Sequence, residues 1–416
     1  MPSQSQPRLP GSHVSDWLGS FASGSGIFPR LLGKAAQDST VGFHHTIREI
    51  CQQPVMWRET GCQMSELAAY IAEGMAGCSR IVLTGSGSSQ YAGECVAGAL
   101  RRDLGKTVEV SGGGDLLLRS KSSAPGESSL VVSLARSGES PESIAVVQTL
   151  LETEPLTRHL VLTCNAQSRL AQEFRHDSRV QVVSLSDNVH DRSLVMTSSF
   201  TNLAFSARFL GWLNRVSEFV DLAAQLDTAG RHLLQNWPDR LRTFVSGPIH
   251  RIVFLGSRDR LGAAREASLK LLEMTGGKIA TMAETFLGLR HGPMSFVDRN
   301  TLVVCFLSSD PVIRAYEQDL IRELDAKGLG ARKLVAGTGD PGAGLCKESD
   351  LAIPYALPGG GADDDGLELL DVMIGQILGL HRCIEEGLRP DSPSENGVIS
   401  RVVADFRIHA AEGAAR

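Results

Sequence analysis

The chain has 416 residues, 42% of them hydrophobic and 21% charged, and its formal net charge at pH 7 is -6. This length exceeds the size at which one hydrophobic core stops growing, so two domains are expected. The negative net charge does not favour binding to nucleic acid or to an anionic membrane. The eight cysteines are scattered and include no CxxC pair, which indicates reduced thiols and no metal site.

The N-terminal segment, residues 1–45, is interpreted as a mobile arm. Its first part is rich in Ser, Gly and Pro and shows no hydrophobic period. It also lacks the basic start and apolar run of a secretory signal, and no later stretch has the roughly 18 uninterrupted apolar residues of a membrane span. The sequence therefore predicts a cytoplasmic protein.

Residues 46–220 are expected to form a first domain that begins with two helices. Apolar residues recur at helical spacing between Thr46 and Gly77, with an interruption near Pro54. Short apolar runs that end in Gly/Ser loops then alternate with stretches of helical spacing, such as Tyr91–Leu104. This alternation is typical of parallel strands joined by crossover helices, because both faces of such strands are covered.

An internal repeat links this domain to residues 221–390. Three segments of the first half resemble three of the second in the same order and at nearly constant spacing. The pairs are IVLTGSGSSQYAG at 81–93 with IVFLGSRDRLGAA at 252–264, SLVVSLARSGES at 129–140 with TLVVCFLSSDPV at 301–312, and HLVLTCNAQSRL at 159–170 with RKLVAGTGDPGA at 332–343. The sequence therefore predicts an α/β fold of two doubly wound parallel-sheet, flavodoxin-like domains, joined by helices over Asp221–Leu241. Ligands of such folds bind at the carboxyl ends of the strands.

The glycine-rich run Gly85–Ser89 follows the strand Ile81–Thr84 and precedes a helix. Glycines such as Gly87 let a ligand approach the backbone, and the helix start offers N–H groups to an anion. Gln90 stands where the dinucleotide fingerprint needs a third Gly or Ala, which speaks against a dinucleotide site. A tight strand–helix turn without a ligand is the alternative reading.

The run Ser133–Pro141 follows the next strand and is more specific. Ser137 and Ser140 flank Gly138 where a helix begins, and their hydroxyls, with the backbone N–H groups, can surround a phosphate without a cluster of lysines. The same residues can also make an N-cap with Pro in the first turn, and both roles can hold together. The second half has Asp310 at the related place, so only the first half is expected to bind phosphate.

The helix that follows Gly256 carries Glu266, Lys270 and Glu273 on one face, while its other positions are almost wholly apolar. Exposed ion pairs are the ordinary reading of this spacing, but buried charges are costly unless they are paired or functional. A functional stripe is therefore favoured. His291 lies in a Gly/Pro turn and has the best loop context of the eleven histidines for acid–base work.

Taken in order, GSGSS, SxARSGES, the EASLKLLEMTGGKI helix and LRHGP resemble the sugar isomerase (SIS) domain family over residues 47–403. MTSSFTNL at 196–203 and ENGVISRVV at 395–403 resemble the AgaS-type galactosamine-6-phosphate deaminases/isomerases, also called tagatose-6-phosphate ketose/aldose isomerases. Glucosamine-6-phosphate synthases share the isomerase half but need an N-terminal glutaminase domain with cysteine directly after Met1, where this chain has Pro2. Glutamine-driven synthesis is therefore not expected.

The resemblance implies roles for individual residues. Those that would hold the 6-phosphate and the sugar are Gly87, Ser88, Ser89, Arg136, Ser137, Ser140, Thr197 and Lys270. Glu273 would move a proton between C1 and C2, and His291 would assist ring opening in the neighbouring subunit of an obligate homodimer. The C-terminal tail, 391–416, would close over the site, although around Ile399–Arg401 it lacks the lysine that the synthases carry. No cofactor is implied.

The chemistry implied is deaminating isomerisation of a hexosamine 6-phosphate, with galactosamine 6-phosphate giving tagatose 6-phosphate. An open-chain 2-amino-aldose has a C2 proton acidified by the aldehyde, and one carboxylate can remove it and return it at C1. The resulting C2 imine takes up water and releases ammonia. Two alternatives stay open, a plain aldose/ketose 6-phosphate isomerase and a non-catalytic phosphosugar-binding regulator. The absence of GxxxxGK[ST] speaks against a kinase, and the absence of a helix-turn-helix pattern lowers the regulator reading.

Overall fold

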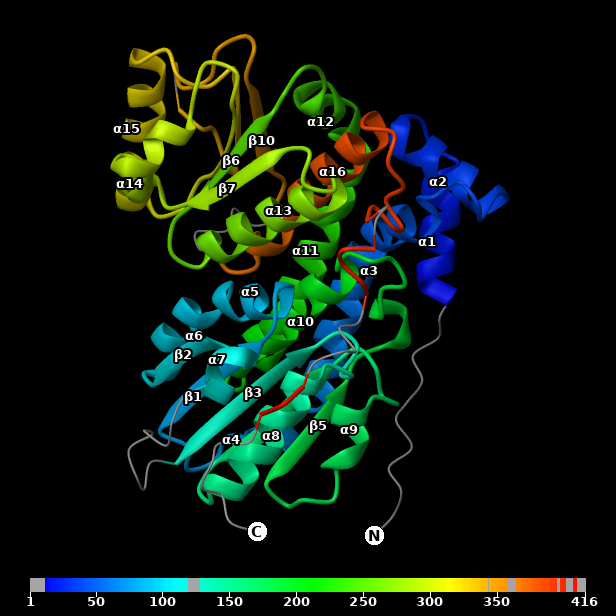
Figure 1. Ribbon diagram of the computed structural model, residues 1–416, viewed down its shortest axis with the longest axis vertical. Coiled ribbons are helices and arrows are strands. Elements are labelled where there is room, and N and C mark those ends of the chain that lie inside the picture. Colours follow the sequence, from blue (N-terminus) through cyan, green and yellow to red (C-terminus); the bar gives the residue numbers. More distant parts are fainter. Residues whose placement is uncertain are drawn as a thin grey trace.

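The structure is a computed structural model that describes residues 12–118, 128–342, 344–357, 364–394, 397–401 and 407–409. Two five-stranded sheets lie one above the other in Figure 1, and neighbouring strands in both are parallel. In these ranges, no helix has both the length and the apolar character that crossing a bilayer demands.

Both sheets have the same strand order. The first reads β2-β1-β3-β4-β5 and the second, from the corresponding edge, β7-β6-β8-β9-β10. The strands of the first sheet are β1 Arg80–Gly85, β2 Thr107–Gly112, β3 Ser129–Ala135, β4 Arg158–Thr163 and β5 Val180–Ser184. Those of the second are β6 Arg251–Gly256, β7 Ala280–Glu284, β8 Leu302–Phe306, β9 Arg332–Thr338 and β10 Leu351–Tyr355. The predicted α/β class with two parallel-sheet domains is confirmed.

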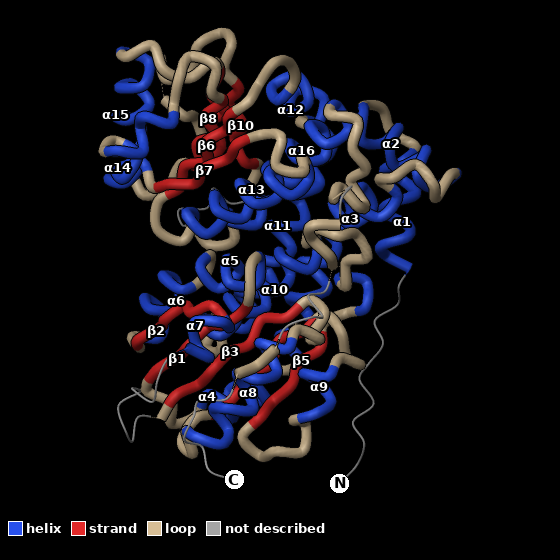
Figure 2. Tube along the Cα trace, in the orientation of Figure 1, coloured by secondary structure: helices blue, strands red, loops and turns tan. Residues whose placement is uncertain are grey.

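Helices lie on both faces of each sheet (Figure 2), which explains why the apolar runs of the central strands are continuous. The helices of the first half are α1 Ser12–Ala22, α2 Ile27–Gln37, α3 His44–Glu66, α4 Ala68–Met75, α5 Ser88–Glu94, α6 Ala97–Leu104, α7 Gly113–Leu118, α8 Pro141–Thr153, α9 Arg169–Glu173, η1 Asp187–Val189, α10 Ser198–Arg208 and η2 Phe209–Gly211. Those of the second half are α11 Val216–Asn236, α12 Pro238–Val245, α13 Arg260–Met274, α14 Phe286–Leu289, η3 Gly292–Phe296, α15 Pro311–Ala326 and α16 Leu367–Glu385.

The prediction of a mobile arm over residues 1–45 is wrong from Ser12 onward, because α1 and α2 pack against α3; residues 1–11 lie outside the described residues. The buried face of α1 consists of Val14, Trp17, Leu18 and Phe21. These positions follow the helical spacing i, i+3, i+4, i+7, which the surrounding Ser and Gly residues obscured. The Trp17 indole N–H donates to Cys51 O at 2.8 Å, and the Arg231 guanidinium lies 4.1 Å from the ring centre.

The helix α3 runs through Pro54 without the interruption that the sequence suggested. A proline lacks the N–H that would bond the carbonyl four residues earlier, here Ile50 O. That carbonyl accepts instead from the Gln53 side-chain Nε2 at 3.1 Å. The helix α11 packs closely on this turn, because a Cβ at Gly230 would lie 2.9 Å from the Pro54 ring. A local side-chain substitute and tight packing thus keep the helix continuous.

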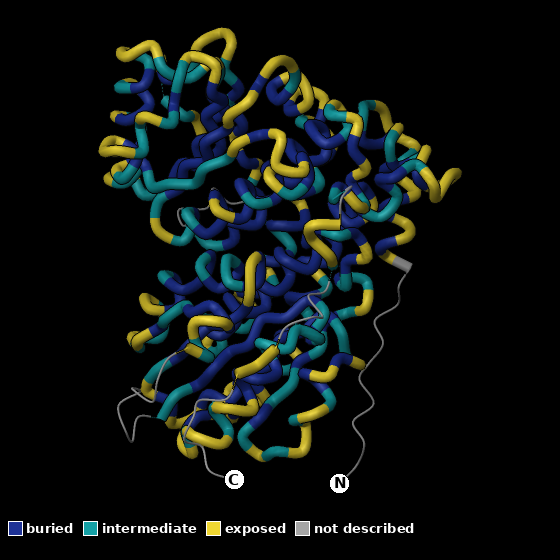
Figure 3. The backbone as a smooth tube through the Cα atoms, viewed as in Figure 1, coloured by how far each residue is buried: buried dark blue, intermediate teal, exposed yellow. Residues whose placement is uncertain are grey.

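The helix α13 belongs to the second domain but lies at the seam with the first. It packs against α16 on one side and α5 on the other, and the buried backbone, dark blue in Figure 3, is concentrated in the sheets and the helices between them. A Cβ at Gly262 would lie 2.6 Å from Cys95 N, so α13 and α5 meet backbone to backbone. Residues on α13 are therefore held close to the loops of the first domain.

Candidate active site

The first serine loop follows β1 and ends at the seam. Gly87 has φ +58° and precedes α5, whose first two residues, Ser88 and Ser89, are each 6% exposed. The Ser88 hydroxyl accepts a hydrogen bond from Lys270 Nζ at 3.0 Å. This bond ties the glycine-rich loop of the first domain directly to α13 of the second.

The second serine loop, Arg136–Ser140, follows β3, the neighbour of β1 in the sheet. It turns at Gly138, which has φ +64° and where a Cβ would lie 2.4 Å from the Ser168 hydroxyl, so the position requires glycine. Ser137 Oγ accepts a 3.3 Å bond from the backbone N–H two residues on. Ser140 takes the N-cap position of α8, but its hydroxyl makes no cap hydrogen bond to the described helix. The side chain of Ser140 therefore does not serve as the helix cap.

Arg136, the first residue of this loop, is buried. Its guanidinium donates to Leu194 O at 2.8 Å and to Arg401 O at 2.6 Å. Burial lowers the pKa of Arg136, while the carboxylate of Asp191 opposes that shift and Glu273 opposes it more weakly. The C-terminal tail thus reaches the first domain at Arg401. Its closure over the site stays a prediction, because residues 395–396, 402–406 and 410–416 lie outside the described residues.

The charged stripe of α13 is buried, as its apolar surroundings suggested. Glu266 and Lys270 are 0% exposed, whereas the Glu273 side chain keeps 23% of its surface exposed. Lys270 Nζ lies 2.5 Å from Glu273 Oε2 and 3.3 Å from Glu266 Oε1. One ammonium group therefore joins the two carboxylates to the Ser88 loop.

Burial and ion pairing act against each other in this stripe. Burial raises the pKa of Glu266 to about 8, although the Lys270 charge works in the opposite direction. Burial by itself would lower the pKa of Lys270, because it disfavours the charged ammonium. The attraction of Glu266 and Glu273 is larger than this effect, so the pKa of Lys270 is raised. Lys270 therefore stays charged at neutral pH, and Glu273 is the carboxylate of the stripe that faces solvent.

Thr197 and His291 are placed differently from the rest. Thr197 is buried next to the start of α10, where its N–H donates to Asp191 Oδ2 at 2.6 Å and its hydroxyl has no partner among the described residues. His291 is exposed in the turn between α14 and η3. The structure thus joins Ser88, Lys270 and Glu273 directly, and His291 stands outside this group within one chain.

Sequence reasoning missed a buried acid that organises the loop before α10. Asp191 is 0% exposed, and its Oδ2 accepts from the N–H groups of Thr197 and Ser199 at 2.6 and 2.9 Å. The Arg401 guanidinium donates to Asp191 O at 3.0 Å. The sequence around Asp191 does not distinguish it from other acids in loops. Its surroundings depend on partners such as Arg401, which lies 210 residues away in the chain. Asp191 therefore supports Thr197 and anchors the tail.

A second missed acid, Glu49 of α3, lies next to Asp191. Burial and the Asp191 charge raise the pKa of Glu49 to about 8. Glu49 Oε1 accepts from the N–H groups of Arg192 and Ser193, and Oε2 is bonded to the Ser193 hydroxyl. A protonated Glu49 can donate its hydrogen to Ser193 Oγ. The single hydrogen of the Ser193 hydroxyl can then be donated to Val195 O at 3.0 Å. The hydrogen-bond pattern thus fits the neutral acid.

Glu49→Gln is expected to stabilise the fold increasingly as pH rises. The amide can accept and donate as the protonated acid does, but it does not titrate. The wild-type native state keeps a proton that the unfolded state loses above its ordinary value of 4.5, so its free energy of unfolding falls by up to about 1.4 kcal/mol per pH unit until about pH 8. Denaturant unfolding across this range should show a gain that grows and then levels off. A gain that does not change with pH would contradict the neutral Glu49.

The corresponding edge of the second domain is filled by carboxylates of the chain itself. Asp310 caps α15 by accepting from the N–H groups of Val312 and Ile313 at 2.9 and 3.2 Å. Asp364 accepts from Ser309 N–H at 2.6 Å. Carboxylate oxygens thus take the backbone donors that an anion would need at this edge. Phosphate binding by the first half alone stays a prediction.

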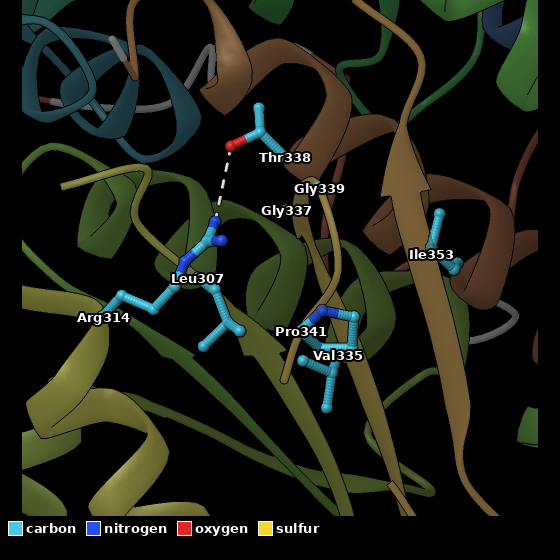
Figure 4. Close-up of a pocket in the computed structure, with 8 residues that line it drawn as sticks. All are labelled: Leu307, Arg314, Val335, Gly337, Thr338, Gly339, Pro341 and Ile353. Carbon is cyan, nitrogen blue, oxygen red and sulfur yellow. Dashed lines mark hydrogen bonds between the residues drawn. The ribbon is translucent and has the colours of Figure 1, made fainter. Parts of the chain in front are cut away.

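A pocket beside this edge is closed as well (Figure 4). Arg314 spans it, donating Nε to Ser308 O at 2.6 Å and Nη2 to Thr338 Oγ1 at 3.4 Å. The lining leaves no space for a molecule the size of water. The second domain therefore offers no ligand cavity at this position.

Comparison with known proteins places the chain in a family. Residues 74–209 match the SIS domain model. A Streptomyces coelicolor protein that provisionally bears the name D-galactosamine-6-phosphate deaminase AgaS is 37% identical over 88% of this chain and 95% of its own length. The D-galactosamine-6-phosphate deaminase AgaS of a Shewanella species is 33% identical over 91% of this chain and 95% of its own.

Solved structures agree with these relatives. The tagatose-6-phosphate ketose/aldose isomerase of Escherichia coli has a TM-score of 0.78 at 29% identity, covering 88% of this chain and 98% of that one. The C-terminal domain of glucosamine-fructose-6-phosphate aminotransferase from Francisella tularensis has a TM-score of 0.70 at 18% identity, covering 84% of this chain and 98% of that one, and shares the fold. The chain therefore belongs to the SIS-domain family and, within it, to the AgaS group of sugar-phosphate isomerases and deaminases.

Proposed function

We propose that this enzyme converts a hexosamine 6-phosphate, preferably D-galactosamine 6-phosphate, to the ketohexose 6-phosphate and ammonia. The observation that carries the proposal is the position of Lys270 Nζ, within hydrogen-bonding distance of both the Ser88 hydroxyl and the Glu273 carboxylate. A sugar anchored by its phosphate at the serine loops would present its carbon chain to that carboxylate. The names of the relatives supply the galacto configuration and the amine.

The 6-phosphate would bind at the two serine loops of the first domain. The hydroxyls of Ser137 and Ser140, the backbone donors at the start of α8, and the Ser88–Ser89 turn line neighbouring strand ends. Arg136, the first residue of the second serine loop, would add positive charge without leaving its two carbonyl partners. Thr197 would add a hydroxyl from the start of α10.

Glu273 would act as the base of the proton transfer. Its carboxylate takes the C2 proton of the open-chain amino aldose, which leaves an enolamine, and returns a proton to C1, which gives a C2 imine. Water adds at C2, ammonia leaves, and the ketone remains. Lys270 would aim the carboxylate and stabilise charge that develops on the sugar oxygen, since its ammonium is fixed by two acids and Ser88.

A plain aldose/ketose 6-phosphate isomerase is the second candidate. The same carboxylate and the same C1/C2 proton transfer would serve a 2-hydroxy sugar, with no imine to hydrolyse. One solved relative carries the name of a tagatose-6-phosphate ketose/aldose isomerase. The described contacts do not include any group that would read the C2 substituent, so the distinction rests on assay.

The test is a substrate panel run on the purified full chain. Ammonia release is measured with galactosamine 6-phosphate and glucosamine 6-phosphate, beside isomerisation of tagatose 6-phosphate. We expect ammonia from galactosamine 6-phosphate at the highest catalytic efficiency, kcat/KM. Isomerisation without ammonia release from either amine would select the plain isomerase, and no turnover of any of the three would select the phosphosugar-binding regulator.

We also propose that the enzyme is a homodimer in which His291 completes the site of the partner subunit. The proposal rests on the family resemblance and on the exposed position of His291, outside the Ser88, Lys270 and Glu273 group. Leu287 and Leu272, on α14 and α13, are large apolar side chains that remain 48% and 40% exposed in the single chain. A second copy that brings His291 to Glu273 would cover surfaces of this kind.

Mixed dimers of two inactive variants should recover activity. In a dimer of one Glu273→Gln chain and one His291→Ala chain, one site keeps both residues and the other loses both. Random exchange of equal amounts should therefore restore roughly a quarter of the wild-type activity, since half of the dimers are mixed and each holds one complete site. Each variant incubated alone provides the control. A mixture with no more activity than its parents would contradict a shared site.

A further inference from the structure

A cavity of about 620 Å³ lies between the domains at the opposite end of the α5 and α13 pair from Ser88 and Glu273. Arginines dominate its charged lining. Arg101 and Arg102 come from α6 of the first domain, and Arg258 and Arg265 come from the second domain. The volume falls within the roughly 300–1,000 Å³ typical of small-molecule sites.

The two carboxylates that also line this cavity are engaged with the protein. Asp259 accepts from the N–H groups of Gly98 and Ala99 at 2.6 and 2.7 Å. Glu94 forms a 2.6 Å ion pair with Arg265. Arg102 also has acidic partners, at 3.4 Å in Asp103 and 3.2 Å in Asp365, neither of which lines the cavity. The positive charge of the lining thus exceeds the negative charge.

Arg258 stands in an unfavourable backbone conformation. Its φ is +53°, and no other described residue except glycines has a positive φ. The loop Gly256-Ser257-Arg258 corresponds in the repeat to Gly85-Ser86-Gly87, where Gly87 has φ +58°. A glycine would adopt this conformation without strain, so an arginine at this position carries a local backbone cost.

The Arg258 side chain is largely exposed, and the residue lines the cavity. It is 70% exposed, and the ion pair it forms with Asp310 spans 4.0 Å, the weak limit of such contacts. Arg101 lines the same cavity from the other domain and is fixed by a 2.7 Å bond from its Nε to Val108 O. Two guanidinium groups from opposite domains thus border one cavity, a geometry suited to an anion that both can contact.

We propose that this cavity is a second binding site, separate from the active site, for a metabolite that carries two linked phosphate groups. A diphosphate has enough charged oxygens to meet Arg101 and Arg258 together. A single phosphate fills a small part of the volume and offers fewer charged oxygens to the two guanidinium groups. The ligand would bridge α6 to the loop that begins α13, the helix that carries Lys270 and Glu273.

Inorganic pyrophosphate and orthophosphate are the probes, and their binding is measured by calorimetric titration. The protein titrated is the full-length Ser137→Ala/Ser140→Ala variant, because its altered serine loop weakens binding at the active site. Pyrophosphate should bind at least about tenfold more tightly than orthophosphate, because two charge-assisted contacts replace one. Adding Arg258→Gly should reduce pyrophosphate affinity by about tenfold or more while leaving thermal unfolding unchanged or higher, since glycine suits the backbone. Arg322→Ala, which removes an exposed arginine of α15 outside the cavity, is the matched control and should leave affinity unchanged.

Two results would overturn the site. One is equal affinity for pyrophosphate and orthophosphate, or no binding of either, in the protein with the altered serine loop. The other is an Arg258→Gly variant that folds and binds pyrophosphate like its parent. Arg101→Met provides a second variant on the opposite wall, and an unchanged affinity there would contradict the contact from both domains.

Discussion

Glu273→Gln should abolish turnover and preserve binding of the phosphosugar. Removal of a general base costs about 10²- to 10⁴-fold in rate, so kcat should fall by that factor. The glutamine oxygen can still accept from Lys270 Nζ, and the serine loops of the first domain are untouched. Steady-state ammonia release gives kcat, and calorimetric titration with galactosamine 6-phosphate gives the dissociation constant. This dissociation constant should stay within about threefold of the wild-type KM, because little of the binding energy comes from the base.

Glu266→Gln is the matched control for this variant. Glu266 lies on the same helix and within 3.3 Å of the same Lys270, but it is fully buried and has no part in the proposed proton transfer. Burial raises the pKa of Glu266 to about 8, so a neutral amide resembles the form that predominates at pH 7. Its kcat should stay within about tenfold of the wild type. Full activity of Glu273→Gln, or loss of substrate binding in that variant, would remove Glu273 from its proposed role.

Lys270→Met should destabilise the protein by about 3–5 kcal/mol at pH 8 and reduce kcat as well. The ammonium is the partner of two carboxylates in a site where Lys270 and Glu266 have no solvent contact. Without the Lys270 charge the pKa of Glu266 rises further, so the buried acid must keep a proton that the unfolded state has lost at pH 8, and this proton uptake costs stability. Denaturant unfolding measures the stability change, and ammonia release measures the rate.

A double variant separates the structural role of Lys270 from its positioning role. Lys270→Met with Glu266→Gln removes both members of the buried pair, so most of the lost stability should return. The rate should not return, because Glu273 would still lack the 2.5 Å contact that fixes its carboxylate. Recovery of both stability and kcat in the double variant would show that Lys270 serves packing alone.

The features that sequence predicted correctly depend on local pattern or on repetition. Apolar runs with Gly/Ser ends appear as β1, β3, β6 and β8, because strands buried on both faces need continuous apolar sequence. The stripe of Glu266, Lys270 and Glu273 could be found from spacing alone, since three charges on an apolar helix stand out.

The features that sequence missed depend on distant partners. The α1 helix is held by contacts such as Trp17 with Cys51, which composition cannot indicate. Continuity through Pro54 relies on Gln53, a compensation that follows from geometry in the folded helix. The buried state of Glu49 and Asp191 arises from packing between α3 and the loop before α10, and neither residue has a distinctive local pattern.

Our central claim is that the two halves of the chain have different roles, phosphate binding in the first and acid–base chemistry in the second. Sequence placed phosphate binding in the first half and acid–base chemistry in the second, and the structure joins Ser88 to Lys270 and Glu273 at the seam. In the second half, Asp310 and Asp364 occupy the donors at the corresponding edge. One ligand should therefore touch both domains in a single site.

A crystal structure of the Glu273→Gln variant bound to galactosamine 6-phosphate tests this claim most directly. We expect the phosphate to lie against Ser137 and Ser140, and C2 of the open-chain sugar to lie within about 3.5 Å of the residue 273 side chain. A phosphate bound at the Ser308–Asp310 edge of the second domain, or a sugar whose C2 lies away from residue 273, would contradict it.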